Sequence, residues 1–154
     1  MIRQHLDAQD HKLIAEAQAI IERHFKEDWH HIGVACLGKS GAIYTSVNMD
    51  TYVGGMAVCG EPVAIGQVVL AEDLPFKTIV AVRKPRASRP EQDISVVSPC
   101  GKCREMIADY AQEADVILID DEGYFKMNIE NLLPYKFTSN KSKKGRHDDY
   151  LHVS

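Results

Sequence analysis

Residues 97–105, VSPCGKCRE, are the stretch of this chain that says most about its fold. Cys100 and Cys103 stand three positions apart, directly behind Pro99. Such a pair can be a redox couple, half of a structural zinc site, or part of a catalytic metal site. Proline is well tolerated just ahead of a helix, so residues 99–112 are predicted to form a helix that begins near these cysteines.

The rest of the sequence bears on these three possibilities. A thioredoxin-type couple usually follows the first strand of its domain, whereas this pair lies about two-thirds of the way along the chain. A structural four-cysteine site needs a second Cys-x-x-Cys, and a zinc finger needs a histidine pair soon after Cys103; the sequence has neither. A three-ligand site remains, in which zinc keeps its fourth position for water.

The segment VCGEP, residues 58–62, can complete such a site. Cys59 offers a third thiolate at the predicted start of another helix, where the helix dipole favours the thiolate form. Glu61 lies two residues further on, so its carboxylate can reach a metal-bound water without itself binding the metal. Cys36, in an apolar run, is expected to pack as a small hydrophobic residue.

Length and composition indicate one soluble domain. The chain has 154 residues, of which 45% are hydrophobic and 26% charged, with a formal net charge of −4. An acidic balance argues against a dedicated nucleic-acid binder. No secretory signal or membrane-spanning run is visible, so we expect a cytoplasmic protein in which disulfides are disfavoured.

Periodicity predicts an α/β fold in which helices cover a single mixed sheet. We expect residues 1–138 to form one domain and residues 139–154 a polar C-terminal tail. The predicted helices are 7–25, 59–74, 99–112 and a short one within 130–137. The predicted strands are 31–38, 41–48, 76–84, 115–120 and 124–129, and 83–93 is predicted to be a basic, solvated loop. The alternative for its basic residues, Arg83, Lys84, Arg86 and Arg89, is that they guard the pocket and select an acidic substituent or a phosphate.

Together the two cysteine segments resemble the zinc deaminase signature, in which Cys-x-Glu is followed by Pro-Cys-x-x-Cys. The chain is similar, more narrowly, to the small cytidine deaminases that act on free nucleosides. SPCGKCRE and the later LLPYKF, residues 132–137, match motifs of that family, and Asn48 lies eleven positions before Cys59, as the ribose-binding asparagine of that family does. The resemblance covers most of the chain.

This resemblance implies a three-layer α/β/α fold with one mixed sheet of about five strands. It implies Zn²⁺ as cofactor, held by Cys59, Cys100 and Cys103, with Glu61 as the proton shuttle. A homotetramer that serves pyrimidine salvage, with a small nucleoside as its substrate partner, is also implied. The implied substrate contacts are Asn48 and Asp50 at the sugar and Gly60, Ser98 and His30 near the base.

Several positions depart from the family pattern. An arginine that usually follows the glutamate is replaced by Pro62, and Arg104 is the candidate to take over its hydrogen bonds to the sulfurs. Asp50 stands where the family has a glutamate, and His30 where it has a stacking phenylalanine. The blasticidin S deaminases, which share the architecture with altered sugar contacts, are therefore an alternative.

Two further alternatives remain open. Deamination of a cytosine within nucleic acid would use the same zinc chemistry but would need a basic, aromatic-lined channel. A non-catalytic zinc domain that binds a ligand or partner would have no use for Glu61.

Overall fold

The computed structural model describes residues 2–139. Its elements follow in the order α1 (Ala8–His24), β1 (Ile32–Leu37), β2 (Ile43–Val47), η1 (Gly54–Met56), α2 (Gly60–Leu70), β3 (Thr78–Arg83), β4 (Ser95–Val97), α3 (Gly101–Tyr110), β5 (Asp115–Asp120), β6 (Gly123–Asn128) and η2 (Ile129–Leu132). The expected helices and strands are found with their ends shifted by a few residues, except that the short helix expected within residues 130–137 is the 3₁₀-helix η2, which starts at Ile129. The predicted tail lies, except for its first residue, outside the described residues.

The strands form one mixed sheet in the order β2-β1-β3-β5-β6, with β4 paired to β3 as a sixth strand. Strand β3 divides one of its edges between two partners. Its first residues, Thr78 and Ile79, pair with β5 in parallel, and its last residues, 81–83, pair with β4 in antiparallel. The α/β class and the mixed sheet are confirmed, and β4 is the strand that the sequence did not predict.

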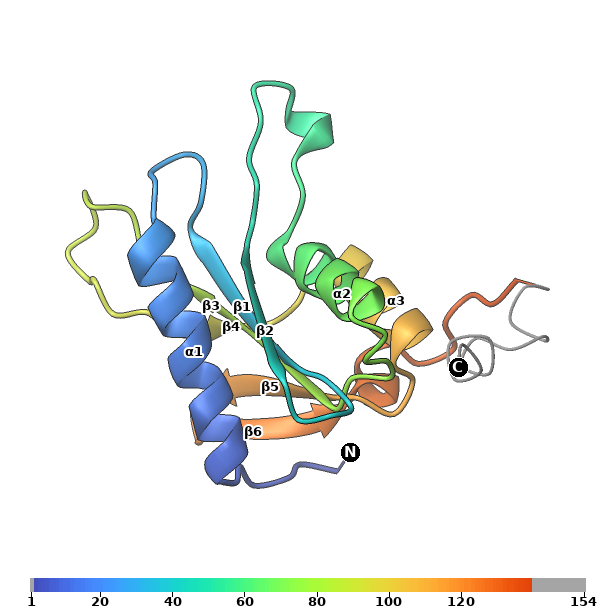
Figure 1. Cartoon of the computed structure of the whole chain (residues 1–154). Coiled ribbons are helices and arrows are strands. Elements are labelled where there is room, and N and C mark those ends of the chain that lie inside the picture. Colours follow the sequence, from blue (N-terminus) through green and yellow to red (C-terminus); the bar gives the residue numbers. More distant parts are fainter. Residues whose placement is uncertain (1, 140–154) are drawn as a thin grey trace.

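Helices cover both faces of this sheet, which gives the expected three layers (Figure 1). On one face, α1 packs Leu13, Ala17 and Ile21 against side chains of β1 and β3. The other face is covered by α2 and α3, which bury Ile65 and Ile107 in a second core. Cys36 is fully buried in that second core, as expected. Within residues 2–139, no helix is both long and apolar enough to cross a membrane.

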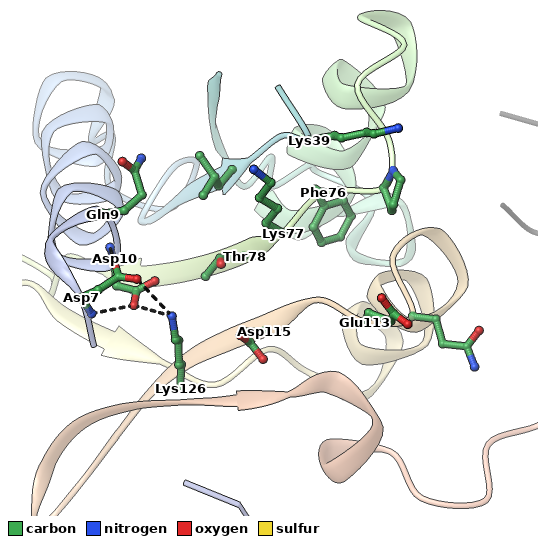
Figure 2. Close-up of a pocket in the computed structure, with 13 residues that line it drawn as sticks. Asp7, Gln9, Asp10, Lys39, Phe76, Lys77, Thr78, Glu113, Asp115 and Lys126 are labelled. Carbon is green, nitrogen blue, oxygen red and sulfur yellow. Dashed lines mark hydrogen bonds and ion pairs between the residues drawn. The ribbon is translucent and has the colours of Figure 1, made fainter. Parts of the chain in front are cut away.

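The start of α1 is fixed by a capping box. Asp7 accepts a hydrogen bond from the backbone N–H of Asp10, and Asp10 accepts one from Asp7 in return. The Asp10 carboxylate is buried and lies 2.8 Å from Lys126 Nζ on β6. These residues line part of a pocket of about 780 Å³ at this end of the sheet (Figure 2). The ion pair therefore ties the first turn of α1 to the sheet.

The turn between β1 and β2 is held by Asp73, which follows α2. Its carboxylate accepts hydrogen bonds from Ser40 N at 2.8 Å, Ser40 Oγ at 2.7 Å and Tyr44 Oη at 2.9 Å. Burial alone would raise the pKa of this carboxyl, but the hydrogen bonds outweigh it and the pKa is lowered. Asp73 is therefore bound as a carboxylate in the fold.

The segment between β2 and α2 extends away from the sheet as a long arm, residues 49–58 (Figure 1). Met49 and Val58 close its base through two backbone hydrogen bonds of 2.9 Å. Large apolar side chains are exposed beyond this closure: Tyr52, Val53 and Met56. The arm begins beside Asn48 and ends at Cys59, so both of its ends lie at positions that the sequence analysis singles out.

Candidate active site

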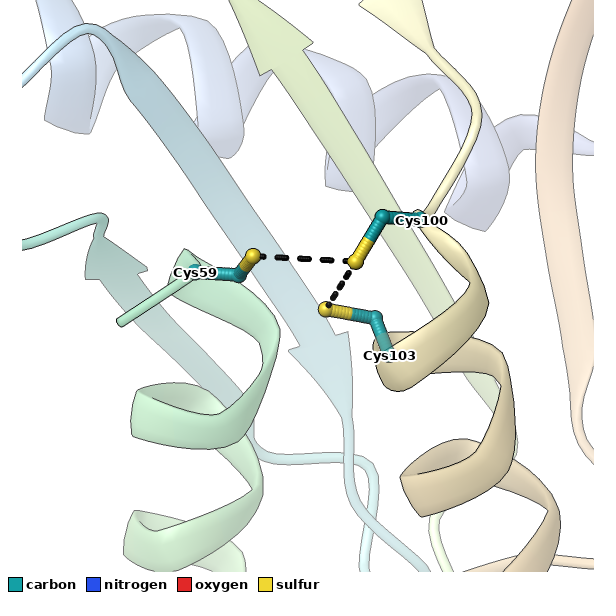
Figure 3. Close-up of side chains that lie close together, drawn as sticks. All are labelled: Cys59, Cys100 and Cys103. Carbon is teal, nitrogen blue, oxygen red and sulfur yellow. Dashed lines mark hydrogen bonds between the residues drawn. The ribbon is translucent and has the colours of Figure 1, made fainter. Parts of the chain in front are cut away.

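The N-termini of α2 and α3 bring the three predicted zinc ligands together (Figure 3). Cys59 is the N-cap residue of α2, Cys100 is the N-cap residue of α3, and Cys103 lies in the first turn of α3. The Cys59 and Cys100 sulfurs are 3.7 Å apart, and the Cys100 and Cys103 sulfurs are 3.5 Å apart. Residues more than forty positions apart in sequence thus present a single cluster of thiols.

This cluster fits a zinc ion. Tetrahedral zinc with Zn–S bonds of about 2.3 Å holds its sulfurs about 3.8 Å apart, close to the spacing observed. Among residues 2–139, these cysteines are the only group of His, Cys, Asp and Glu side chains placed to bind one ion. Three protein ligands leave one position of a tetrahedron open, which is the arrangement of catalytic zinc sites.

The electrostatics of the thiols show what a bound cation would have to offset. Burial raises the pKa of Cys103, and the nearby carboxylate of Glu61 raises it further. Burial likewise raises the pKa of Cys59. For Cys100, burial is outweighed by hydrogen bonds from the backbone N–H groups of Cys103 and Lys102 and from the neighbouring thiols, so its pKa is lowered. A divalent cation supplies the positive charge that holds all three as thiolates.

Glu61 lies at the second position of α2, beside the sulfurs. Its side chain is only 5% exposed, and Oε2 lies 3.4 Å from Cys103 Sγ. Burial raises the pKa of this carboxyl, and hydrogen bonds from the backbone N–H of Glu61 itself and from Cys103 offset only part of that effect. A carboxyl whose pKa is raised toward neutrality can accept a proton and give it up again within the pocket.

A pocket of about 270 Å³ opens in front of Cys59, Glu61 and Cys100. Its other lining residues are His31, Ile32, Asn48, Asp50, Ala57, Val58, Gly60, Val97 and Ser98. The volume is just below the usual range of about 300–1,000 Å³ for small-molecule sites. The larger pocket of Figure 2 is elsewhere: it is lined by Leu37 at the end of β1, whereas this one is lined by Ile32 at its start.

Four of the five predicted substrate contacts therefore line one pocket, and the fifth does not. His30 is absent from the lining of this pocket, and its Nδ1 lies 2.8 Å from the backbone oxygen of Asn48. His31, which the sequence analysis did not select, lines the pocket, and its Nδ1 is 3.7 Å from Asp50 Oδ2. Burial lowers the pKa of His31, although Asp50 opposes this effect.

Asn48 holds the backbone at the edge of the pocket. Its Oδ1 accepts hydrogen bonds from the N–H groups of His31 at 2.8 Å and Ile32 at 2.9 Å. Its Nδ2 lies 3.4 Å from the carbonyl oxygen of Trp29 and 3.3 Å from His31 Nδ1. Asn48 as a whole residue is only 5% exposed. Asn48 thus fixes the segment that presents His31 to the pocket.

Gly60 is required by close packing between α2 and the sheet. A Cβ atom at this position would lie 2.7 Å from Val34 Cγ2 and 3.3 Å from Asn48 N. The Gly60 carbonyl accepts a hydrogen bond of 2.6 Å from Ser46 Oγ. The absence of a side chain therefore lets the first turn of α2, with Glu61, approach β1 and β2.

Arg104 braces the loop that carries Cys100. Its Nε donates to the carbonyl oxygen of Pro99 at 2.9 Å, and its Nη1 donates to that of Leu132 at 3.2 Å. The predicted hydrogen bonds to the sulfurs are not among the contacts of Arg104 within the described residues. Arg104 therefore acts on the site through the backbone next to the ligand.

Comparison with known families adds to this geometry. Residues 7–119 match the model of the cytidine and deoxycytidylate deaminase zinc-binding region. The chain belongs to this family. The family comprises hydrolases that act on carbon–nitrogen bonds, and the cysteine cluster is consistent with its zinc-binding region.

Relatives of known name support the same assignment. The blasticidin-S deaminase of Bacillus cereus is 39% identical over 135 residues, which cover 88% of this chain and 96% of the relative. The cytidine deaminase of Sporosarcina psychrophila is 28% identical over 130 residues, which cover 82% and 90%. The crystal structure of the Bacillus anthracis cytidine deaminase matches with a TM-score of 0.71 at 19% identity, covering 94% of this chain and 96% of that one. The last comparison establishes the shared fold.

Proposed function

We propose that this family member is a zinc-dependent hydrolase that removes the 4-amino group from the cytosine ring of a free nucleoside. Cytidine and deoxycytidine, which would become uridine and deoxyuridine, are the first candidate substrates. One observation carries the proposal: the buried carboxyl of Glu61 lies beside three sulfurs that are spaced for one zinc ion, at the wall of a small pocket. A purely structural zinc site has no use for such a carboxyl.

The reaction consumes water and releases ammonia. A zinc ion held by Cys59, Cys100 and Cys103 would polarise a water molecule and lower its pKa toward neutrality. Water gives its oxygen to C4 of the ring, so its two protons must move, one to ring nitrogen N3 and one to the departing amino group. Glu61 would carry both, a role supported by its position in the pocket wall and by the burial that raises its pKa.

The remaining lining residues would hold the substrate. We propose that backbone groups of Gly60 and Ser98 bind the edge of the pyrimidine, since both lie in the wall shared with Glu61. Asp50 and the surroundings of Asn48 would bind the sugar. The Asn48 amide already bonds backbone groups of the neighbouring turn, so Asp50 is the more available of the two.

Blasticidin S is the second candidate substrate. The observation that favours it is the 39% identity, over nearly the full length of both chains, with a protein named blasticidin-S deaminase.

We further propose that residues 1–138 form the catalytic unit, that the protein works in the cytoplasm in pyrimidine salvage, and that it assembles as a homotetramer. Light scattering that finds a fully active monomer would contradict the last point.

Ammonia release by purified, zinc-loaded protein tests the main proposal. The panel contains cytidine, deoxycytidine, cytosine, 5-methylcytidine, cytidine monophosphate and blasticidin S. The Glu61→Gln variant should keep its zinc and lose about 10²–10⁴-fold in turnover, the usual contribution of a proton-transferring group. Glu16→Gln, an exposed change on α1, is the matched control and should match the wild type.

The outcomes separate the alternatives. Turnover of a panel member that depends on Glu61 supports the deaminase and identifies its substrate. A Glu61→Gln protein that holds its zinc and keeps full activity would refute the proposed role of this residue. If no panel compound releases ammonia and the protein binds single-stranded nucleic acid in a salt-sensitive way, the nucleic-acid alternative is favoured.

A further inference from the structure

Three arginines surround a second pocket at the hairpin between β3 and β4. The pocket has a volume of about 280 Å³ and is lined by Arg83, Pro85, Arg86, Arg89, Glu91 and Ser95. Its charged lining residues are thus three guanidinium groups and one carboxylate. The excess of positive charge contrasts with the net charge of −4 of the whole chain.

This hairpin has an ordered structure of its own. Arg83 pairs with Ser95 at its base, in the register of β3 and β4. At its tip, Arg89 N donates to the carbonyl oxygen of Arg86 at 3.0 Å. The side chain of Gln92 donates to the carbonyl oxygens of Arg86 at 2.9 Å and Arg89 at 2.7 Å. The backbone that presents two of the arginines is therefore fixed by one amide group.

The arginine pocket is connected to the candidate active site. Arg83 and Arg86 also line a small pocket of about 60 Å³, whose wall includes His31 and Asp50. Those two residues in turn line the pocket that contains Cys59 and Glu61. Shared lining residues thus place the arginine pocket next to the small pocket, and the small pocket next to the one that contains the zinc ligands.

The electrostatics of His31 agree with this proximity. Burial is the largest cause of its lowered pKa and Asp50 opposes it, while the positive charges of Arg83 and Arg86 add to the lowering. Both arginines are therefore close enough to influence a side chain of the active-site pocket. The strand that leaves the arginine hairpin, β4, continues directly into Ser98 and Cys100.

Two of the three guanidinium groups are available to a ligand. Arg86 pairs with Asp28 at 2.8 Å, both side chains being more than half exposed. Arg83 and Arg89 make no ion pair within residues 2–139. Guanidinium groups bind phosphate and carboxylate through two parallel hydrogen bonds, which gives both strength and orientation.

We propose that Arg83, Arg86 and Arg89 form a subsite for an anionic group on the sugar of the substrate. The inference rests on the proposed function, because it assigns the cytosine ring to the pocket beside Glu61. It narrows the substrate class to cytosine nucleosides that carry a phosphate or a carboxylate beyond the sugar. Asp50 lines both the pocket beside Glu61 and the small pocket that Arg83 and Arg86 share, so we place a sugar hydroxyl at Asp50 and the anion at the arginines.

Substrate pairs that differ only in the anionic group test this proposal. Deoxycytidine is compared with its 5′-monophosphate, and blasticidin S with its methyl ester, by kcat/KM at low salt. We expect the anionic member of at least one pair to be preferred by roughly tenfold or more. The phosphate pair and the carboxylate pair distinguish the two sources of the anion. Arg89→Ala and Arg83→Ala should reduce the preference roughly tenfold and leave the neutral compounds unchanged.

Binding measurements make the outcome independent of turnover. The same pairs are titrated calorimetrically into Glu61→Gln protein, with Lys12→Ala, an exposed change on α1, as the charge-matched control. Anion preference without any turnover in the wild type would keep the subsite and reject the deaminase. The subsite would be overturned, even if deamination holds, by either of two results. One is equal affinity for both members of each pair; the other is an equal loss of affinity for neutral and anionic compounds in the arginine variants.

Discussion

Replacing Asn48 by alanine tests whether this residue mainly builds the pocket or mainly binds the substrate. The amide oxygen accepts hydrogen bonds from the backbone N–H groups of His31 and Ile32, at 2.8 and 2.9 Å. Alanine would leave both donors without that partner, at about 1–3 kcal/mol for each buried group. Because His31 and Ile32 are half-buried, we take the lower part of this range and expect a loss of about 2–4 kcal/mol.

Such a loss is a large fraction of the about 5–15 kcal/mol by which most domains are stable. Urea unfolding at fixed protein and zinc concentrations measures it, since bound metal and assembly both shift the apparent stability. Asn48→Asp keeps the acceptor oxygen but places a second oxygen 3.4 Å from the Trp29 carbonyl, so an intermediate loss is expected. Asn131→Ala, exposed in η2, should change stability by less than about 0.5 kcal/mol.

The refuting result is specific. If Asn48→Ala is as stable as the Asn131→Ala control, the two hydrogen bonds do not hold the turn. If alanine and aspartate cost the same, the acceptor oxygen is not the group that matters. An unchanged stability with a raised KM would restore Asn48 to the role of a simple sugar contact.

Three other changes have effects that follow from contacts described above. Asp73 has a pKa below its unfolded value of about 3.9, so the stability it contributes is present above about pH 4 and lost as the pH falls through the folded-state pKa; Asp73→Asn should therefore flatten the fall in melting temperature below about pH 4, and an unchanged fall would contradict this. Asp10→Ala removes the ion pair with Lys126 and a helix cap, and should cost about 1–3 kcal/mol in urea, whereas a loss below about 0.5 kcal/mol would show that the cap and ion pair add little. Arg104→Lys cannot keep both carbonyl contacts and should lose zinc faster to a weak chelator, measured by metal analysis; retention equal to wild type would refute the bracing role.

The helices and the two cysteine motifs were predictable because the signal for each of them is local. Leu13, Ala17 and Ile21 recur at helical spacing on α1, and the two cysteine segments each precede an apolar helical run. The start of α3 is then predicted by Pro99, which is well tolerated just ahead of a helix, and the start of α2 by the helical spacing of the apolar residues that follow Cys59. These features depend on neighbours in sequence, which is why sequence analysis recovered them.

Other features depend on partners that are distant in sequence. Strand β4 has only three residues, and it exists because the last residues of β3 offer a free edge to it. His31, not His30, lines the pocket because Asn48 fixes the turn before β1, a contact across seventeen positions. The arm of residues 49–58 has no periodic pattern of its own, and the sequence analysis did not anticipate it.

The position of the zinc ligands has a consequence for chain entropy. Cys59 and Cys100 are 41 positions apart, each at the start of a different helix. An ion bound to both would close a loop of that length in any chain that retains the metal, as a disulfide does. The loop-closure relation for cross-links gives about 4 kcal/mol for such a length. The same ion that would activate water would then also link the N-terminus of α2 to that of α3, and removing it would reduce thermal stability along with activity.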